Sequence, residues 1–222
     1  MGKPRVQEVL KTLPGCSQTG FYEDRISLLR GLVIFRGGDF AFTRYGRYDD
    51  EQRYDDALGL LTRSLVQNGQ NTIAWYVIAY IYHEKAMMVT RQMNSSLEGN
   101  NKEPVHRRWS PQTIEDTKIK ANRRSLIYLN ASIGTYSVLI ANNAFDVEAY
   151  TRRARTFYAA YSKYEQNTEF LKSAIKDYSC AIDLDPLSYE WFYERGMIYS
   201  YLGESERSEA DLKKSAELKA SR

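Results

Sequence analysis

Residues 174–186 read AIKDYSCAIDLDP, and this stretch decides the fold. Its small and large positions recur further along the chain, where Ala174, Asp177, Tyr178 and Ala181 correspond to Ser208, Asp211, Leu212 and Ser215. Small residues let two helices approach closely, and the large neighbours fill the remaining space. Pro186 lacks an N–H group and disfavours helix at Asp185, so one helix is expected to end here.

A second pattern follows that helix. Residues 192–199 read FYERGMIY, an aromatic residue followed by Arg195-Gly196 and then Tyr199. Leu202-Gly203 follows as a turn, because glycine tolerates a positive φ at a helix end. Together the two patterns resemble the tetratricopeptide repeat (TPR) family, whose first helix carries W-x2-L-G-x2-Y within a unit of about 34 residues. The resemblance implies an all-α fold, a right-handed α-solenoid of helix-turn-helix repeats.

The same register runs up the chain. The first small residue of a second helix precedes the leading aromatic of the next helix by one constant interval in three pairs: Ala57 and Trp75, Ser132 and Tyr150, Ala174 and Phe192. Around Trp75 the sequence reads WYVIAYIY, very close to the family signature. A general helical bundle explains apolar periodicity but not this constant interval, so we favour a repeat array over residues 57–222.

Extra residues fall inside repeats and not between them. The interval from leading aromatic to small residue is shortest from Phe192 to Ser208, longer from Tyr150 to Ala174, and by far the longest from Trp75 to Ser132. Solenoids accept length there because the loop lies at one edge of the stack. The largest insertion, about residues 94–112, predicts a long helical hairpin with a polar loop near 94–110. Ser110-Pro111 is typical of the start of its second helix.

Residues 1–56 are expected to form an N-terminal helical segment and a degenerate start of the first repeat. Short helices are predicted over residues 6–13 and 26–35, with a further turn over 39–45. The charged run at residues 45–56, YGRYDDEQRYDD, is interpreted as a loop that leads into the helix at Asp56.

The resemblance implies protein partners. In TPR proteins the first helices line a concave groove, and the candidate groove residues here are Tyr76, Tyr80, His83, Arg152, Arg155, Tyr158, Glu190, Tyr193, Glu194 and Met197. Tyrosine supplies contact area at low entropic cost, and the chain has 18 tyrosines. Chaperone-clamping TPR proteins use Lys with Asn or Arg at two first-helix places. At the corresponding places of this chain only Arg152 fits. Glu190 and Glu194 would repel the carboxylate of a chaperone C-terminus.

The inserted hairpin carries a local basic run that includes Trp109. Its candidate surface residues are Arg107, Arg108, Trp109, Arg123 and Arg124. Net charge is only +3, so nucleic acid is disfavoured as a partner, although this run keeps RNA open as an alternative.

Chemical sites are not indicated. His83 and His106 are the only histidines, neither has a ligand at metal-binding spacing, and phosphate-binding glycine motifs are absent. The carboxylates are interpreted as solvated helix-face charge. We therefore expect no enzyme, no cofactor, no metal and no membrane span. The two cysteines, Cys16 and Cys180, lie far apart in the sequence and favour a reducing compartment and a cytoplasmic location, with cytoskeletal association as a candidate.

Three hypotheses follow. The chain is a scaffold subunit of a multiprotein assembly, a free adaptor that binds a peptide in the groove, or an RNA-binding helical-repeat protein. The final helix is interpreted as uncapped, with an apolar face at Leu212, Ala216 and Leu218, so self-association through it is also kept as an alternative.

Overall fold

The structure is a computed structural model, and it describes residues 27–32, 49–163 and 166–221. The chain divides into two compact units, Met1–Ile81 and Tyr82–Arg222. The boundary lies within one long helix, α4 (Thr72–Lys102). Each unit is described by itself.

The first unit contains a helical stretch at residues 27–32, the helix α3 (Asp49–Gln67) and the start of α4. A Cβ placed on Gly31 would lie 2.8 Å from Leu61 Cγ, so this close helix approach requires glycine. Asn71 caps α4 by accepting a hydrogen bond from the Ala74 N–H at 3.2 Å. Its amide also donates to the buried Ser64 hydroxyl at 3.0 Å, which joins the cap to α3.

The prediction of a loop over residues 45–56 is wrong from Asp49 onward, because α3 begins at that residue. Gln52 and Asp56 are one turn apart and are hydrogen-bonded at 2.9 Å. Acidic residues in a first helical turn are favourable because of the helix dipole, so the charged run does not oppose helix formation. The helices expected over 6–13 and 39–45 lie outside the described residues, and of the helix expected over 26–35 the structure describes residues 27–32, which are helical.

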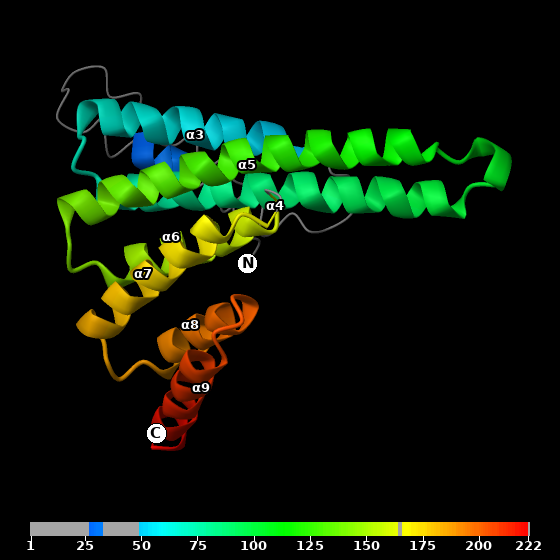
Figure 1. Cartoon of the computed structure of the whole chain (residues 1–222). Coiled ribbons are helices and arrows are strands. Elements are labelled where there is room, and N and C mark those ends of the chain that lie inside the picture. Colours follow the sequence, from blue (N-terminus) through cyan, green and yellow to red (C-terminus); the bar gives the residue numbers. More distant parts are fainter. Residues whose placement is uncertain (1–26, 33–48, 164–165, 222) are drawn as a thin grey trace, which may run out of the picture. The chain divides into compact units, whose positions relative to one another are not determined.

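The second unit continues with helices that follow one another along the chain: α5 (Pro111–Asn142), α6 (Val147–Tyr161), α7 (Thr168–Leu184), α8 (Tyr189–Tyr201) and α9 (Ser205–Ala220). Each packs against the next, from α5 with α6 through to α8 with α9 (Figure 1). One core cluster gathers Leu171, Ala174, Tyr178 and Ile198 between α7 and its neighbours. The TPR-like α-solenoid predicted from the repeat pattern is confirmed.

The sequence signals for helix ends are also confirmed. The Ser110 hydroxyl accepts a hydrogen bond from the Thr113 N–H at 3.1 Å and caps α5. Asp146 and Asn167, which were not predicted as caps, cap α6 and α7 in the same way. Helix α7 ends at Leu184, before Pro186, and Gly203 turns into α9 with a φ of 75°.

The predicted helical hairpin is present, but its loop is shorter than expected. Helix α4 continues through residues 94–102, so only residues 103–110 connect it to α5. The helix persists because one side of α4 is covered there. Met93 and Leu97 are half-buried on that side, and Asn100 is buried. Closer to the array, the Ser125 hydroxyl donates to the Ala86 carbonyl at 3.0 Å, which brings the two helices close together.

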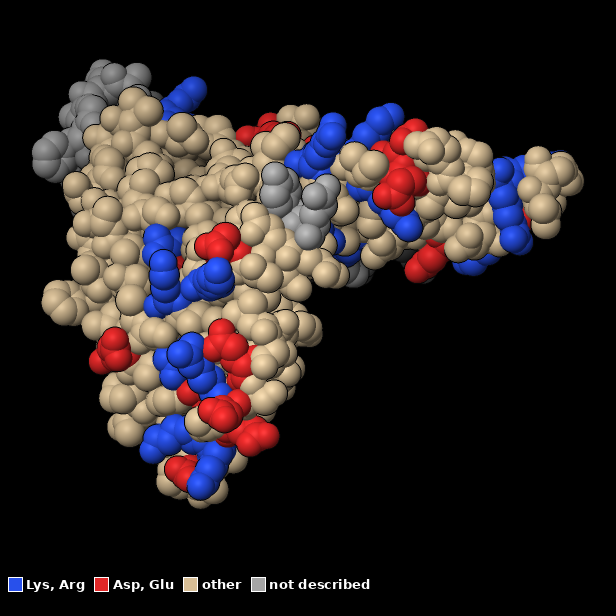
Figure 2. Space-filling view, viewed as in Figure 1, with Lys and Arg blue, Asp and Glu red and all other residues tan. Residues whose placement is uncertain are grey.

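The outer face of α9 is charged. Leu212 and Leu218 are half-buried, and of the three residues expected to form an apolar face only Ala216 is exposed. The remaining exposed side chains include Glu209, Lys213 and Glu217. Figure 2 shows basic and acidic residues mixed over the part of the surface where α8 and α9 lie. The apolar face that favoured self-association through α9 is therefore mostly covered within the chain.

Candidate protein-interaction site

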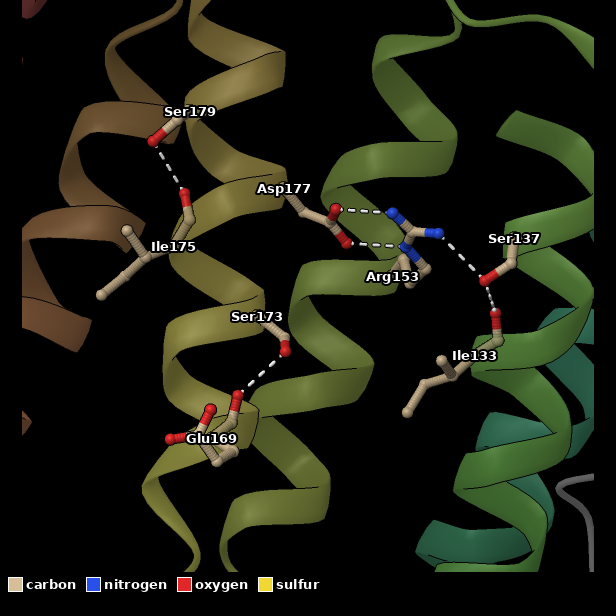
Figure 3. Close-up of polar contacts among 8 residues, drawn as sticks. All are labelled: Ile133, Ser137, Arg153, Glu169, Ser173, Ile175, Asp177 and Ser179. Atoms are coloured by element: carbon tan, nitrogen blue, oxygen red, sulfur yellow. Dashed lines mark hydrogen bonds and ion pairs between the residues drawn. The ribbon is translucent and has the colours of Figure 1, made fainter. Parts of the chain in front are cut away.

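A buried ion pair joins the two helices of one repeat to the helix before them. The Arg153 guanidinium on α6 donates to both carboxylate oxygens of Asp177 on α7, at 2.8 and 2.7 Å. Its third donor reaches the Ser137 hydroxyl on α5 at 2.9 Å. Ser137 in turn donates to the Ile133 carbonyl at 2.8 Å, so the chain of donors and acceptors is complete (Figure 3). We call this arrangement the first clamp.

The next repeat contains the same arrangement, which we call the second clamp. Arg195 on α8 donates to both oxygens of Asp211 on α9, at 2.7 and 2.8 Å. It also donates to the Ser179 hydroxyl on α7 at 2.9 Å, and Ser179 donates to the Ile175 carbonyl. Each clamp therefore fixes three consecutive helices, because the fork of an arginine accepts only one geometry for paired oxygens.

The signature aromatics surround these arginines. Arg153 lies 5.9 Å from the Tyr150 ring and 6.0 Å from the Phe157 ring. Arg195 lies 5.8 Å from the Phe192 ring and 5.9 Å from the Tyr199 ring. The guanidinium thus occupies the middle of the aromatic-x2-Arg-x3-aromatic pattern, where cation–π attraction adds to the ion pair.

The clamps correct the interpretation of the carboxylates. Asp177 and Asp211 are buried, at 4% and 7% exposure, and are not solvated helix-face charges. Burial raises the pKa of the Asp177 carboxyl, and Arg153 opposes that shift. The hydrogen bonds to Asp177 and Asp211 raise the pKa values of Arg153 and Arg195, so both guanidinium groups stay charged.

The clamps fix α6 and α8, which together with the second-unit part of α4 carry a partly exposed surface that we call the first-helix face. Its members are His83, Arg152, Arg155, Tyr158, Tyr193, Glu194, Met197 and Tyr201. Tyr193, Met197 and Tyr201 follow one another at one-turn spacing along α8, and Tyr193 and Tyr201 are 51% and 54% exposed. The face therefore offers large, amphipathic side chains on a rigid support.

Arg155 connects two first helices. Its guanidinium on α6 lies 3.3 Å from the Glu194 carboxylate on α8 and 5.9 Å from the Trp191 ring. Burial raises the pKa of Tyr178, Glu194 adds to the shift and Arg155 opposes it, so the phenol stays neutral.

Two tyrosines meet across the same pair of helices. The Tyr158 and Tyr201 rings have centroids 5.6 Å apart and are tilted by 48°. Burial and the hydrogen bond with Tyr201 raise the pKa of Tyr158 to about 12. This contact leaves both rings more than a third exposed, so they stay available to a partner.

His83 lies where α4 meets α6. Its Nδ1 atom is 3.3 Å from the Thr156 hydroxyl oxygen, and the Thr156 hydroxyl donates to the Arg152 carbonyl at 2.9 Å. Because a hydroxyl has one hydrogen, the His83 Nδ1–H is the donor to Thr156. Burial lowers the pKa of His83, Glu84 opposes the shift and Arg152 adds to it, so the ring is held neutral.

The other predicted groove residues lie as follows. Arg152 pairs with Glu148 one turn away on α6, and Glu190 accepts from the Ser188 hydroxyl at 2.8 Å near the start of α8. Tyr76 is half-buried and Tyr80 is 38% exposed on the part of α4 that belongs to the first unit. Their roles as partner contacts stay predictions.

The predicted residues of the hairpin surface form two groups. Arg107, Arg108 and Trp109 lie in the connecting loop, whereas Arg123 and Arg124 lie on α5, about 20 Å away at about 1.5 Å per residue. Glu115 and Asp116 are exposed between the two groups. Arg124 lies 6.0 Å from the Tyr128 ring.

Among the described residues, no three His, Cys, Asp or Glu side chains come together in a way that could hold a metal ion. In the same part of the chain, no helix is both long enough and apolar enough to cross a bilayer.

Comparisons with known proteins agree with the helical array. No protein-family model matches the chain, and no curated protein matches it either. A solved structure of MamA from AMB-1 is similar over 98% of this chain and 85% of its own, at 13% identity and a TM-score of 0.55. MamA from Desulfovibrio magneticus RS-1 is similar over 98% and 87%, at 16% identity and a TM-score of 0.51.

The chain has a TPR-like fold. A thermophilic TPR protein of Thermus thermophilus is also similar, over 88% of this chain and 74% of its own, at 20% identity and a TM-score of 0.46. At these identities the likeness concerns the arrangement of helices, so the surface chemistry must come from the residues described above.

Sequence reasoning missed the clamps and Tyr201. Arg153 and Arg195 occupy the same place in the signature, and Asp177 and Asp211 lie one repeat apart. The recurrence of both residue types together could have indicated the two ion pairs. Tyr201 lies one turn beyond Met197, and helical spacing alone points to it.

Proposed function

We propose that this chain is a non-enzymatic protein-interaction scaffold and a structural subunit of a larger multiprotein assembly. The observation that carries the proposal is the row of exposed Tyr193, Met197 and Tyr201 on a frame fixed by two buried clamps. Tyrosine and methionine are enriched in protein interfaces, where a rigid support reduces the entropy lost on binding.

Surface charge supports a protein partner of neutral or mixed character. Arg155 and Arg152 already pair with Glu194 and Glu148 of this chain, so an acidic segment would have to displace those carboxylates. Tyrosine contacts require no such displacement. We extend the proposal to one interaction array over residues 57–222 and to a cytoplasmic assembly, cytoskeletal among the candidates.

The test starts with the native protein, isolated at near-physiological salt, cross-linked and analysed by mass spectrometry. We expect the wild type in a stable assembly with the same few neighbours cross-linked to α6 and α8. Tyr193→Ser/Tyr201→Ser should release it. The matched control is Phe145→Ser/Leu187→Ser, which removes two exposed apolar side chains from inter-helix loops. A wild-type monomer without fixed neighbours would refute the assembly.

The free peptide adaptor is the second candidate, and the exposed contact between Arg155 and Glu194 across two first helices favours it. In that case Arg152→Ala or Tyr80→Ala weakens peptide binding, while deletion of residues 95–109 leaves it unchanged. RNA binding is the least favoured candidate, because Glu115 and Asp116 offset the charges of Lys118 and Lys120 in the middle of the basic run. Self-association through α9 predicts a dimer that Lys213→Glu disrupts in sedimentation measurements.

A further inference from the structure

The connection between α4 and α5 forms a structured loop at the end of the hairpin. We call residues 102–110 the hairpin tip. Helix α4 is 31 residues long and α5 is 32, so the hairpin carries this loop well away from α6. A single helical turn, η1 (Val105–Arg107), forms its centre.

Several hydrogen bonds fix the conformation of the tip. The buried Asn100 side chain accepts from the Trp109 N–H at 2.6 Å. The Arg108 guanidinium donates to the Glu103 carbonyl at 2.8 Å, and the Arg107 N–H donates to the Pro104 carbonyl at 2.8 Å. These contacts hold the loop in one shape, which reduces the entropy that a binding partner would have to overcome.

The tip exposes apolar and basic side chains together. Val105 is 80% exposed and Trp109 is 38% exposed. Lys102, Arg107 and Arg108 are basic, Glu103 is the single acidic residue between 101 and 110, and all of them are exposed. Within the described residues, Lys102, Arg107 and Arg108 form no ion pair with a carboxylate. Figure 2 shows basic and uncharged residues next to one another at this end of the hairpin.

The arrangement favours a protein partner over the other anionic partners. A nucleic acid needs a continuous row of phosphate contacts, but Glu115 and Asp116 offset Lys118 and Lys120, so residues 111–122 between the tip and Arg123 carry no net charge. A bilayer needs many apolar side chains that can insert, but Val105 and Trp109 are the only large apolar residues of the tip, and the Trp109 backbone is tied to Asn100. Tryptophan and arginine are the residue types most often found at the centre of protein interfaces.

We propose that the hairpin tip docks an acidic protein segment, which places an aliphatic or aromatic side chain against Val105 and Trp109 and carboxylates against Lys102 and Arg107. The proposal rests on the scaffold function and identifies the chemistry of one partner. This surface is separate from the first-helix face, where Glu148 and Glu194 already occupy the arginines.

The experiment selects short linear peptides from a displayed library on the immobilised full-length chain and measures the Kd of each synthetic winner by fluorescence anisotropy. The test variant is Lys102→Glu/Arg107→Glu, because neither side chain makes a hydrogen bond that holds the loop. The matched control is Lys118→Glu/Arg123→Glu, which changes the charge of α5 by the same amount. Trp109→Ala tests the apolar contact, and circular dichroism confirms the helix content of every variant.

We expect a winner with at least two acidic residues beside an apolar one. Its Kd should rise at least 10-fold in the test variant and in Trp109→Ala, and less than 2-fold in the control. The Kd should also rise when salt is increased from about 50 to about 200 mM, because exposed charges are screened.

Two results of these binding measurements would overturn the proposal, and a third would come from the native assembly. One is the absence of any acidic winner that is sensitive to the tip variants. The other is wild-type binding to vesicles of mixed phosphatidylcholine and phosphatidylserine, or to a single-stranded RNA oligonucleotide, that the test variant abolishes. A native assembly that lacks cross-links from the tip would reject this docking site while leaving the scaffold function standing.

Discussion

Replacing Arg153 by methionine should destabilise the protein through the charge that it leaves behind. Asp177 is 4% exposed, and its two oxygens accept from Arg153 at 2.7 and 2.8 Å. Removing one partner of a buried pair costs about 3–5 kcal/mol. The Arg153 side chain is 19% exposed, so we expect the lower end, about 3 kcal/mol. For a chain of this size that corresponds to a fall of about 9 °C in Tm.

The chain itself supplies a control for this reasoning. In the register of the repeats, Ile78 and Thr135 occupy the places of Arg153 and Asp177. The Thr135 hydroxyl satisfies itself by donating to the Ala131 carbonyl at 2.8 Å. We therefore expect Arg153→Ile/Asp177→Thr to lose less than about 1.5 kcal/mol, because no buried charge is left unpaired.

Thermal unfolding followed by circular dichroism measures both variants, at pH 7 and at pH 5. Without Arg153, burial alone raises the pKa of Asp177, so the folded state of Arg153→Met binds a proton more tightly than the unfolded state. Its deficit should therefore shrink as the pH falls. A loss below about 1 kcal/mol for Arg153→Met, or an equal loss for the double variant, would refute the reasoning.

Three further predictions concern single residues of the second unit. The pKa of His83 is lowered in the folded state, so the unfolded state binds more protons below pH 6.5. The free energy of unfolding of the wild type should therefore fall as the pH drops from 7 to 5. In urea titrations His83→Gln should flatten that slope. Gly196→Val should cost about 2–3 kcal/mol, because even a Cβ there lies 3.2 Å from Leu212 Cγ, and an unchanged Tm would contradict the close packing of α8 on α9. Gly134→Ala should raise stability by about 0.5–1 kcal/mol, since nothing lies within 4 Å of the added Cβ, and a measured loss would contradict this open space.

Local sequence signals predicted the helix-turn-helix order well. The constant interval from small residue to aromatic, the Ser110-Pro111 start and the Gly203 turn each depend on residues close in the chain, and each is confirmed. The failures are also local in origin. The run at residues 45–56 and the polar residues 94–102 were interpreted as loop because they are rich in charged and amide side chains. Helix α4 extends because one side of it is covered, which composition does not report.

The candidate surface was predicted in part. His83, Arg155, Tyr158 and Glu194 were placed on one face by the family register, and the contacts between α4, α6 and α8 bring them together. The same register could not reveal that Arg155 is already engaged by Glu194. That pairing depends on the separation of two helices, because its partners lie 39 residues apart in the chain.

By itself the sequence determined the repeat, since small residues at fixed intervals are needed wherever helices pack closely. It also determined the Ser110 cap of α5 and the place of the insertion. Only the tertiary structure decided the state of the charges. Asp177 and Asp211 resemble any surface carboxylate in the sequence, and they become buried, paired groups because packing brings an arginine fork 24 and 16 residues away into contact with them. Burial removes water, and an ion without water must find its partner within the fold.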